Sequence, residues 1–88
     1  MHPSCSSTDW RELVSRIVKS EMTKKKLRYS DLSELLASQE TKQSSANLRN
    51  KINRGIMGAD LFVQLLLVMQ VKQLSRESIL DILDSLKD

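Results

Sequence analysis

Hydrophobic residues recur every three or four positions over residues 10–22, which is the period of one face of a helix. This stripe predicts a helix from about Asp9 to Lys24, capped by Asp9 together with Glu12. A short second helix is predicted next, with Ser30 as its N-cap and its leucines facing inward. The polar stretch 38–42 has no periodicity and is predicted to be a loop. The apolar members of the two stripes are Trp10, Leu13, Val14, Ile17, Val18, Met22, Leu32, Leu35 and Leu36.

The third predicted helix is mostly polar. Either Ser44 or Ser45 can cap its start, and Gly55 is placed to end it in the left-handed conformation. Its apolar residues are only Ala46, Leu48 and Ile52. Nearly all of the others carry hydrogen-bonding groups: Asn47, Arg49, Asn50, Lys51, Asn53 and Arg54.

The last third of the chain is strongly hydrophobic. Residues 59–69 are apolar on nearly every side, which predicts a helix buried at the centre of the core. A fifth helix is predicted from Ser75, with Leu74 and Ile79 as a hydrophobic staple. Its apolar stripe is wider than a helix at the edge of a small bundle needs, and consists of Ile79, Leu80, Ile82, Leu83 and Leu86.

Composition agrees with one compact all-α bundle of five helices. A chain of 88 residues is too short for two independent cores. Its 40% apolar but only 3% aromatic content predicts a core of aliphatic side chains, and its two Gly and one Pro disfavour a β fold with many turns. We therefore expect a flexible tail over residues 1–8 and a single domain over residues 9–88.

Several features that the sequence lacks narrow the possible compartment and chemistry of the protein. The single cysteine, Cys5, has no partner for an internal disulfide, which favours a reducing compartment. Residues 1–7 have no apolar stretch of the signal-peptide kind, and the apolar run 61–69 is too short to cross a bilayer. His2 and Cys5 are fewer than the three or four ligands of a zinc site and form no catalytic pair. We expect a cytoplasmic protein without membrane partner that is not an enzyme and needs no metal or cofactor.

The charges are unevenly distributed along the chain. Residues 1–55 carry eleven Lys and Arg against six Asp and Glu, a balance of +5. Residues 56–88 carry three against five, a balance of −2. A basic N-terminal part and an acidic C-terminal part suit a protein that binds a polyanion through one face. The alternative is a solvated surface of uneven charge.

The segment 44–55 carries the chemistry of base recognition. In the major groove Asn and Gln pair with adenine, and Arg and Lys pair with guanine. The segment has no acidic residue, and its three Asn and two Ser give it poor helix propensity, which makes an ordinary solvated helix a weaker explanation. The basic run 24–28 is placed to contact phosphates just before a helix N-terminus. The residues expected to contact DNA are Lys24, Lys25, Lys26, Arg28, Ser30, Lys42, Gln43, Ser44, Ser45, Asn47, Asn50, Lys51 and Arg54.

The helix order and two motifs resemble the λ-repressor/Cro-like helix-turn-helix domains over residues 10–71. Leu32–Leu36 matches the Leu-Ala-x-x-Leu pattern of that family's second helix, and Ile52–Gly55 matches its Ile-x-x-Gly pattern. The string Asn47–Gly55 is also similar to a family of small uncharacterised bacterial domains. The resemblance implies a bacterial or phage regulator that represses transcription. The loop 37–43 is longer than the family's tight turn and has no Gly. The sequence therefore does not determine the angle between the second and third predicted helices.

Sequence-specific binding of double-stranded DNA by a homodimer is the function that these observations favour. Pairing through the fifth helix would bury its free side and place two third helices about 34–36 Å apart. The alternative is that the monomer's own core uses the whole stripe. Two other functions stay open: a protein-interaction module without nucleic-acid contact, and RNA binding, which the low aromatic content disfavours. The expected dimer residues are Ile79, Ile82, Leu83 and Leu86.

Overall fold

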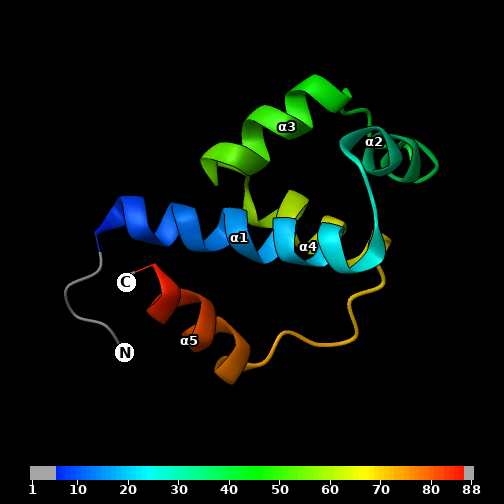
Figure 1. Ribbon diagram of the computed structural model, residues 1–88. Coiled ribbons are helices and arrows are strands. Elements are labelled where there is room, and N and C mark those ends of the chain that lie inside the picture. The colour runs from blue at the N-terminus through cyan, green and yellow to red at the C-terminus, as the bar shows by residue number, and fades with distance from the viewer. Residues whose placement is uncertain (1–5, 87–88) are drawn as a thin grey trace.

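The computed structural model describes residues 6–86, which form five α-helices and no strand (Figure 1). The long α1 lies in the middle, α3 packs against one side of it, and α5 packs against another side. The second helix, α2, contacts both α3 and α4. The predicted all-α class is therefore confirmed. The helices are α1 (Ser7–Lys25), α2 (Tyr29–Ala37), α3 (Ser45–Arg54), α4 (Ala59–Val68) and α5 (Arg76–Ser85).

α1 begins two residues before the predicted cap. The Ser6 hydroxyl accepts a hydrogen bond from the Asp9 N–H at 3.3 Å, and the Asp9 carboxylate accepts one from the Ser6 N–H at 2.9 Å. Asp9 is thus the third helical residue, and the prediction of Asp9 as N-cap is wrong because Ser6 forms the reciprocal pair with it. Ser7 and Thr8, expected in the tail, are helical. His2 and Cys5 lie outside the described residues.

The apolar stripes of α1 and α2 are narrower than predicted. In α1, Trp10 is 44% exposed. In α2, Leu32 and Leu36 are fully buried, but Leu35 is 36% exposed because it lies at the edge of the face that they share. α2 also begins earlier than predicted, with Arg28 rather than Ser30 at the N-cap position. The Arg28 N–H donates to the Asp31 carboxylate at 2.8 Å, so Asp31 supplies the cap.

α3 agrees with its prediction at both ends. The Ser44 hydroxyl accepts from the Asn47 N–H at 3.0 Å, which makes Ser44 the N-cap. Gly55 ends the helix with a φ of 63°. A Cβ at Gly55 would lie 1.9 Å from the carbonyl oxygen of Arg11, so the end of α3 lies directly on the backbone of α1. The position of α3 therefore depends on a glycine at this point.

α4 is not buried on all sides. Leu61, Leu65 and Met69 belong to the core, whereas Val63 is 53% and Leu67 is 66% exposed. The sequence predicts a helix buried on most sides at the centre of the core; one face does lie in the core, but the other helices cover only part of the rest of α4. Its opposite face is left in solvent.

The core consists of two clusters that meet at Phe62, which packs against both. The larger cluster joins α1–α4, and the smaller one joins Leu13 and Ile17 of α1 to Leu83 of α5. The apolar stripe of α5 thus packs within the monomer, because it covers the side of α1 that carries Leu13 and Ile17. This corrects the expectation that one side of the stripe stays free: Leu83 is 1% exposed, and Ile79, Ile82 and Leu86 are half-buried against the cluster.

Candidate nucleic-acid interface

α3 presents a face of amides and cations to solvent. Leu48 and Ile52 are fully buried and fix the helix to the core. Within Ser45–Arg54 there is no acidic residue to neutralise the charge of this face. The α3 face consists of the exposed residues Ala46, Asn47, Arg49, Asn50, Asn53 and Arg54.

The residues predicted to bind DNA around α3 divide into two groups. Asn47 and Asn50 are exposed, and their side chains form no hydrogen bond within residues 6–86. Lys51 is half-buried, and its Nζ donates to Gln43 Oε1 at 3.3 Å. Asn47 and Asn50 thus offer unused donors and acceptors, whereas the side chains of Lys51 and Gln43 are hydrogen-bonded to each other.

Tyr29 connects α2 to the α3 face, and sequence reasoning missed this contact. The Tyr29 hydroxyl donates to Asn53 Oδ1 at 3.2 Å, and the Arg49 guanidinium carbon lies 5.7 Å from the centre of the Tyr29 ring. Arg49 and Asn53 are four residues apart on α3, so their shared face was visible in the sequence. Tyr29 lies far from both along the chain, and no periodicity places it there. Neither Arg49 nor Asn53 was among the predicted contact residues.

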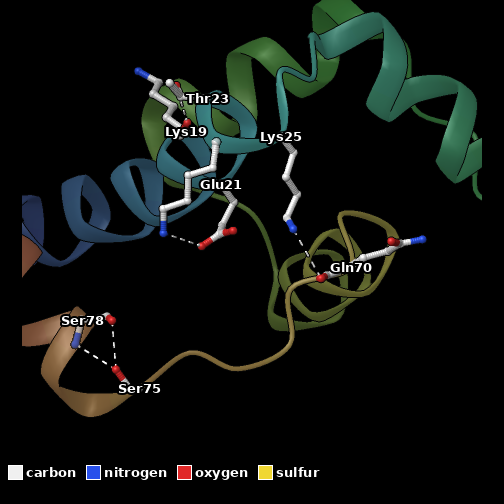
Figure 2. Close-up of polar contacts among 8 residues, drawn as sticks. Lys19, Glu21, Thr23, Lys25, Gln70, Ser75 and Ser78 are labelled. Carbon is white, nitrogen blue, oxygen red and sulfur yellow. Dashed lines mark hydrogen bonds and ion pairs between the residues drawn. The ribbon is translucent and has the colours of Figure 1, made fainter.

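The basic run at the end of α1 is divided by the fold. Lys26 and Arg28 line a hollow beside Tyr29, together with Lys19 and Thr23. Lys25 extends in another direction, and its Nζ donates to the backbone oxygen of Gln70 at 3.5 Å (Figure 2). Lys26 therefore lies beside Tyr29, and Arg28 also reaches α3, whereas Lys25 lies at the end of α4. Lys24 forms an exposed ion pair with Glu21 at 3.4 Å.

A second hollow lies between the N-terminal ends of α2 and α3. It brings together three predicted residues, Arg28, Ser30 and Ser45, with Arg49. The N-terminal ends of helices favour anions, and the two guanidinium groups add full positive charges. The Arg28 guanidinium lies 3.6 Å from Asp31, but this pair is exposed and holds it weakly. This arrangement is suited to a phosphate group.

The cationic surface continues past both ends of α3. Lys42 is exposed in the loop that leads into the helix. At the other end, Arg54 and Asn53 line a hollow with Arg11 and one carboxylate, Glu12, of α1. The acidic residues of α5 are exposed, and α5 lies on the other side of α1 from α3 (Figure 1). The uneven charge of the sequence is therefore also an uneven charge of the surface.

None of the five helices is long and apolar enough to cross a bilayer. Residues 6–86 also contain no group of three His, Cys, Asp or Glu side chains that could hold a metal ion.

The family model for a domain of unknown function, DUF6471, matches residues 10–74, about three quarters of the chain. The chain belongs to this family. Its DUF6471 domain contains α2, α3, α4 and α1 from Trp10 onward, and it includes the whole α3 face. The match ends at Leu74, so α5 follows the DUF6471 domain. No curated protein and no solved structure matches the chain.

Proposed function

We propose that the DUF6471 domain of this chain binds double-stranded DNA and acts as a bacterial or phage transcriptional regulator. The observation that carries the proposal is the α3 face, which has exposed Asn and Arg side chains, no carboxylate and two buried anchors. These side-chain types read base edges in the major groove, which is wide enough for one helix. In this proposal α2 and α3 act as a helix-turn-helix pair.

Two sets of residues have different roles in the proposed complex. Asn47 and Asn50, with unused amides, contact base edges. The cations around α3 and in the hollow beside Tyr29 contact phosphates and supply the part of the affinity that does not depend on sequence. These cations include Lys26, Arg28, Lys42 and Arg54.

The long connection between α2 and α3 is held by hydrogen bonds, which supports its use as the turn of such a pair. The Ser33 hydroxyl donates to the Gln43 backbone oxygen at 2.6 Å, and Gln64 Nε2 donates to Thr41 Oγ1 at 2.6 Å. Glu40 takes the left-handed conformation, with a φ of 63°, that a glycine would take in a tighter turn. A recognition helix needs such a rigid support, because side chains that are not held in place discriminate poorly between bases.

The proposal is tested by selecting sites from random duplexes and then titrating salt. We expect the logarithm of the binding constant to fall with the logarithm of salt by about 0.9 per phosphate contacted. Affinity for the selected site should exceed that for random duplex by about a thousandfold or more. A protein that selects no site and shows no salt dependence would contradict the proposal.

Asn47→Ala and Asn50→Ala test the assignment of the α3 face. Each loss of a bidentate contact should cost about 1–3 kcal/mol on the selected site and leave binding to random duplex unchanged. Gln73→Ala removes an exposed amide in the connection before α5 and is the matched control. Fluorescence anisotropy with labelled duplexes measures all three. Unchanged discrimination in both Asn variants would show that α3 does not read bases.

A further inference from the structure

A hydrophobic stripe on α4 and its C-terminal turn is left without cover. Asp60, Val63 and Leu67 follow one another at spacings of three and four residues, so they form one line along the helix, and Gln70 follows three residues later in the turn that ends it. All four are exposed, and the two apolar ones stand at the centre. Gln70 lies just past the end of α4 and has a φ of 58°, so it closes the line from the turn and not from the helix itself. Leu35 of α2, also exposed, lines a hollow with Gln70 and extends the apolar surface at that end. We call Asp60, Val63, Leu67 and Gln70 the α4 stripe.

The α4 stripe is complementary to itself in one arrangement. Two antiparallel copies, related by a two-fold axis through residue 65, would place each Val63 opposite a Leu67. The same axis would place each Asp60 opposite the Gln70 of the other copy. With a rise of about 1.5 Å per residue, the two ends of the stripe are about 15 Å apart.

Charge favours this antiparallel arrangement. Lys25 donates to the backbone oxygen of Gln70, so its ammonium group lies at the C-terminal end of the stripe (Figure 2). Asp60 is at the N-terminal end. Within residues 6–86 neither Asp60 nor Lys25 forms an ion pair. Antiparallel pairing brings each Asp60 toward a Lys25, whereas parallel pairing would bring like charges together.

We propose that the α4 stripe is a homodimer interface, in which two copies of the chain pair antiparallel through α4. The proposal does not rest on DNA binding, because pairing is measured without DNA. Four residues and the neighbouring Leu35 are few compared with the about 20–30 residues on each side of a standard interface. The dimer is therefore weak, and its population depends on concentration.

Sedimentation equilibrium of the full chain tests the pairing. The average mass of the wild type should rise from the monomer value of 10.1 kDa toward twice that value with increasing concentration. Leu67→Glu should raise the dissociation constant by about tenfold or more, because it brings two carboxylates into the apolar centre. Ile56→Glu is the matched control, since Ile56 is 46% exposed but lies outside the α4 stripe. Circular dichroism checks that both variants stay helical.

Charge reversal tests the antiparallel register and does not depend on Leu67→Glu remaining folded. Asp60→Lys alone and Lys25→Asp alone should each associate less than the wild type, because each homodimer then contains two pairs of like charges. An equimolar mixture of the two variants should associate again, because both contacts of the mixed dimer then join opposite charges.

Three results would overturn the proposal. The first is a wild type that stays monomeric at about millimolar concentration. The second is a dimer that Ile56→Glu weakens as much as Leu67→Glu does, which would place the interface elsewhere. The third is a mixture of Asp60→Lys and Lys25→Asp that associates no better than either variant alone.

Discussion

Gly55 is the residue at which α3 meets α1. Its φ of 63° is costly for residues with a side chain, and a Cβ would lie well inside the contact distance of the Arg11 backbone. Backbone atoms of a helix cannot move aside as a flexible side chain can. Gly55 therefore controls both the end of α3 and its distance from α1.

Gly55→Ala should lower the free energy of unfolding by about 2–4 kcal/mol, because it combines left-handed strain with overpacking. Urea denaturation followed by circular dichroism measures the change. Gly58→Ala is the control: Gly58 has a φ of −70°, and its Cβ would meet only the Asp60 side chain. The control should cost about 1 kcal/mol or less, as a weaker N-cap. Equal losses in the two variants would mean that the contact with Arg11 is not important.

At the scale of elements, side-chain caps fix where three of the helices begin. Ser6, Ser44 and Ser75 each accept a hydrogen bond from an N–H three residues later, at the N-terminal ends of α1, α3 and α5. For α3, the sequence left Ser44 and Ser45 as alternatives, because both have the required hydroxyl. The hydrogen bond to Asn47 shows that Ser44 is the cap.

Ser44→Ala should destabilise the chain by about 1 kcal/mol, since the N–H of Asn47 loses its acceptor. Ser45→Ala changes the neighbouring residue, already inside α3, and should be close to neutral because Ala favours the helix. Thermal unfolding of both variants separates the two positions. A larger loss in Ser45→Ala would reverse the assignment of the cap.

At the scale of the whole molecule, α5 stabilises the side of α1 that α3 and α4 do not cover. Leu83 of α5 is buried between Leu13 and Ile17, and Phe62 connects this cluster to the larger one. The DUF6471 match ends before α5, yet residues inside that match need α5 to cover them. We therefore expect α5 and the DUF6471 domain to unfold together.

Leu83→Ala should cost about 2–5 kcal/mol and preserve a single unfolding transition, because it opens a cavity in the smaller cluster. Leu80→Ala is the control, since Leu80 is only half-buried on the same helix. Denaturation is followed by two signals. The fluorescence of Trp10 reports on α1, and circular dichroism reports on the helices of the whole chain. Two separate transitions in the wild type would show that α5 unfolds on its own.

The proposed DNA complex also depends on charge across the whole molecule. Lys26→Ala or Arg28→Ala should weaken binding about equally on all sequences and lower the salt slope by about one unit, since each removes a phosphate contact. Lys72→Ala removes an exposed cation beyond α4 and should leave the slope unchanged. Anisotropy titrations at several salt concentrations measure the slopes. A loss limited to one DNA sequence would contradict the phosphate role.

The sequence by itself determined the number and order of the helices, the end of α3 and the buried pair Leu48 and Ile52. These features follow from interactions within a few residues: the helical period, the cap and the left-handed glycine. Local signals also placed amides and cations together on α3. They could not distinguish Ser6 from Asp9 as the cap of α1. The pair Ser6 and Asp9 and the pair Asp9 and Glu12 both have the three-residue spacing of a capping box.

Only the tertiary structure decided which apolar faces are covered and which cations lie together. α4 is apolar nearly all round, so its sequence could not indicate that Val63 and Leu67 face solvent. Lys25 and Lys26 are neighbours in the chain, yet one lies at the end of α4 and the other beside Tyr29. The helical period shows whether one face of a helix is apolar or charged. It does not show which segment packs on that face, because that segment is tens of residues away in the chain. Covered and exposed faces are therefore fixed by packing of the whole chain.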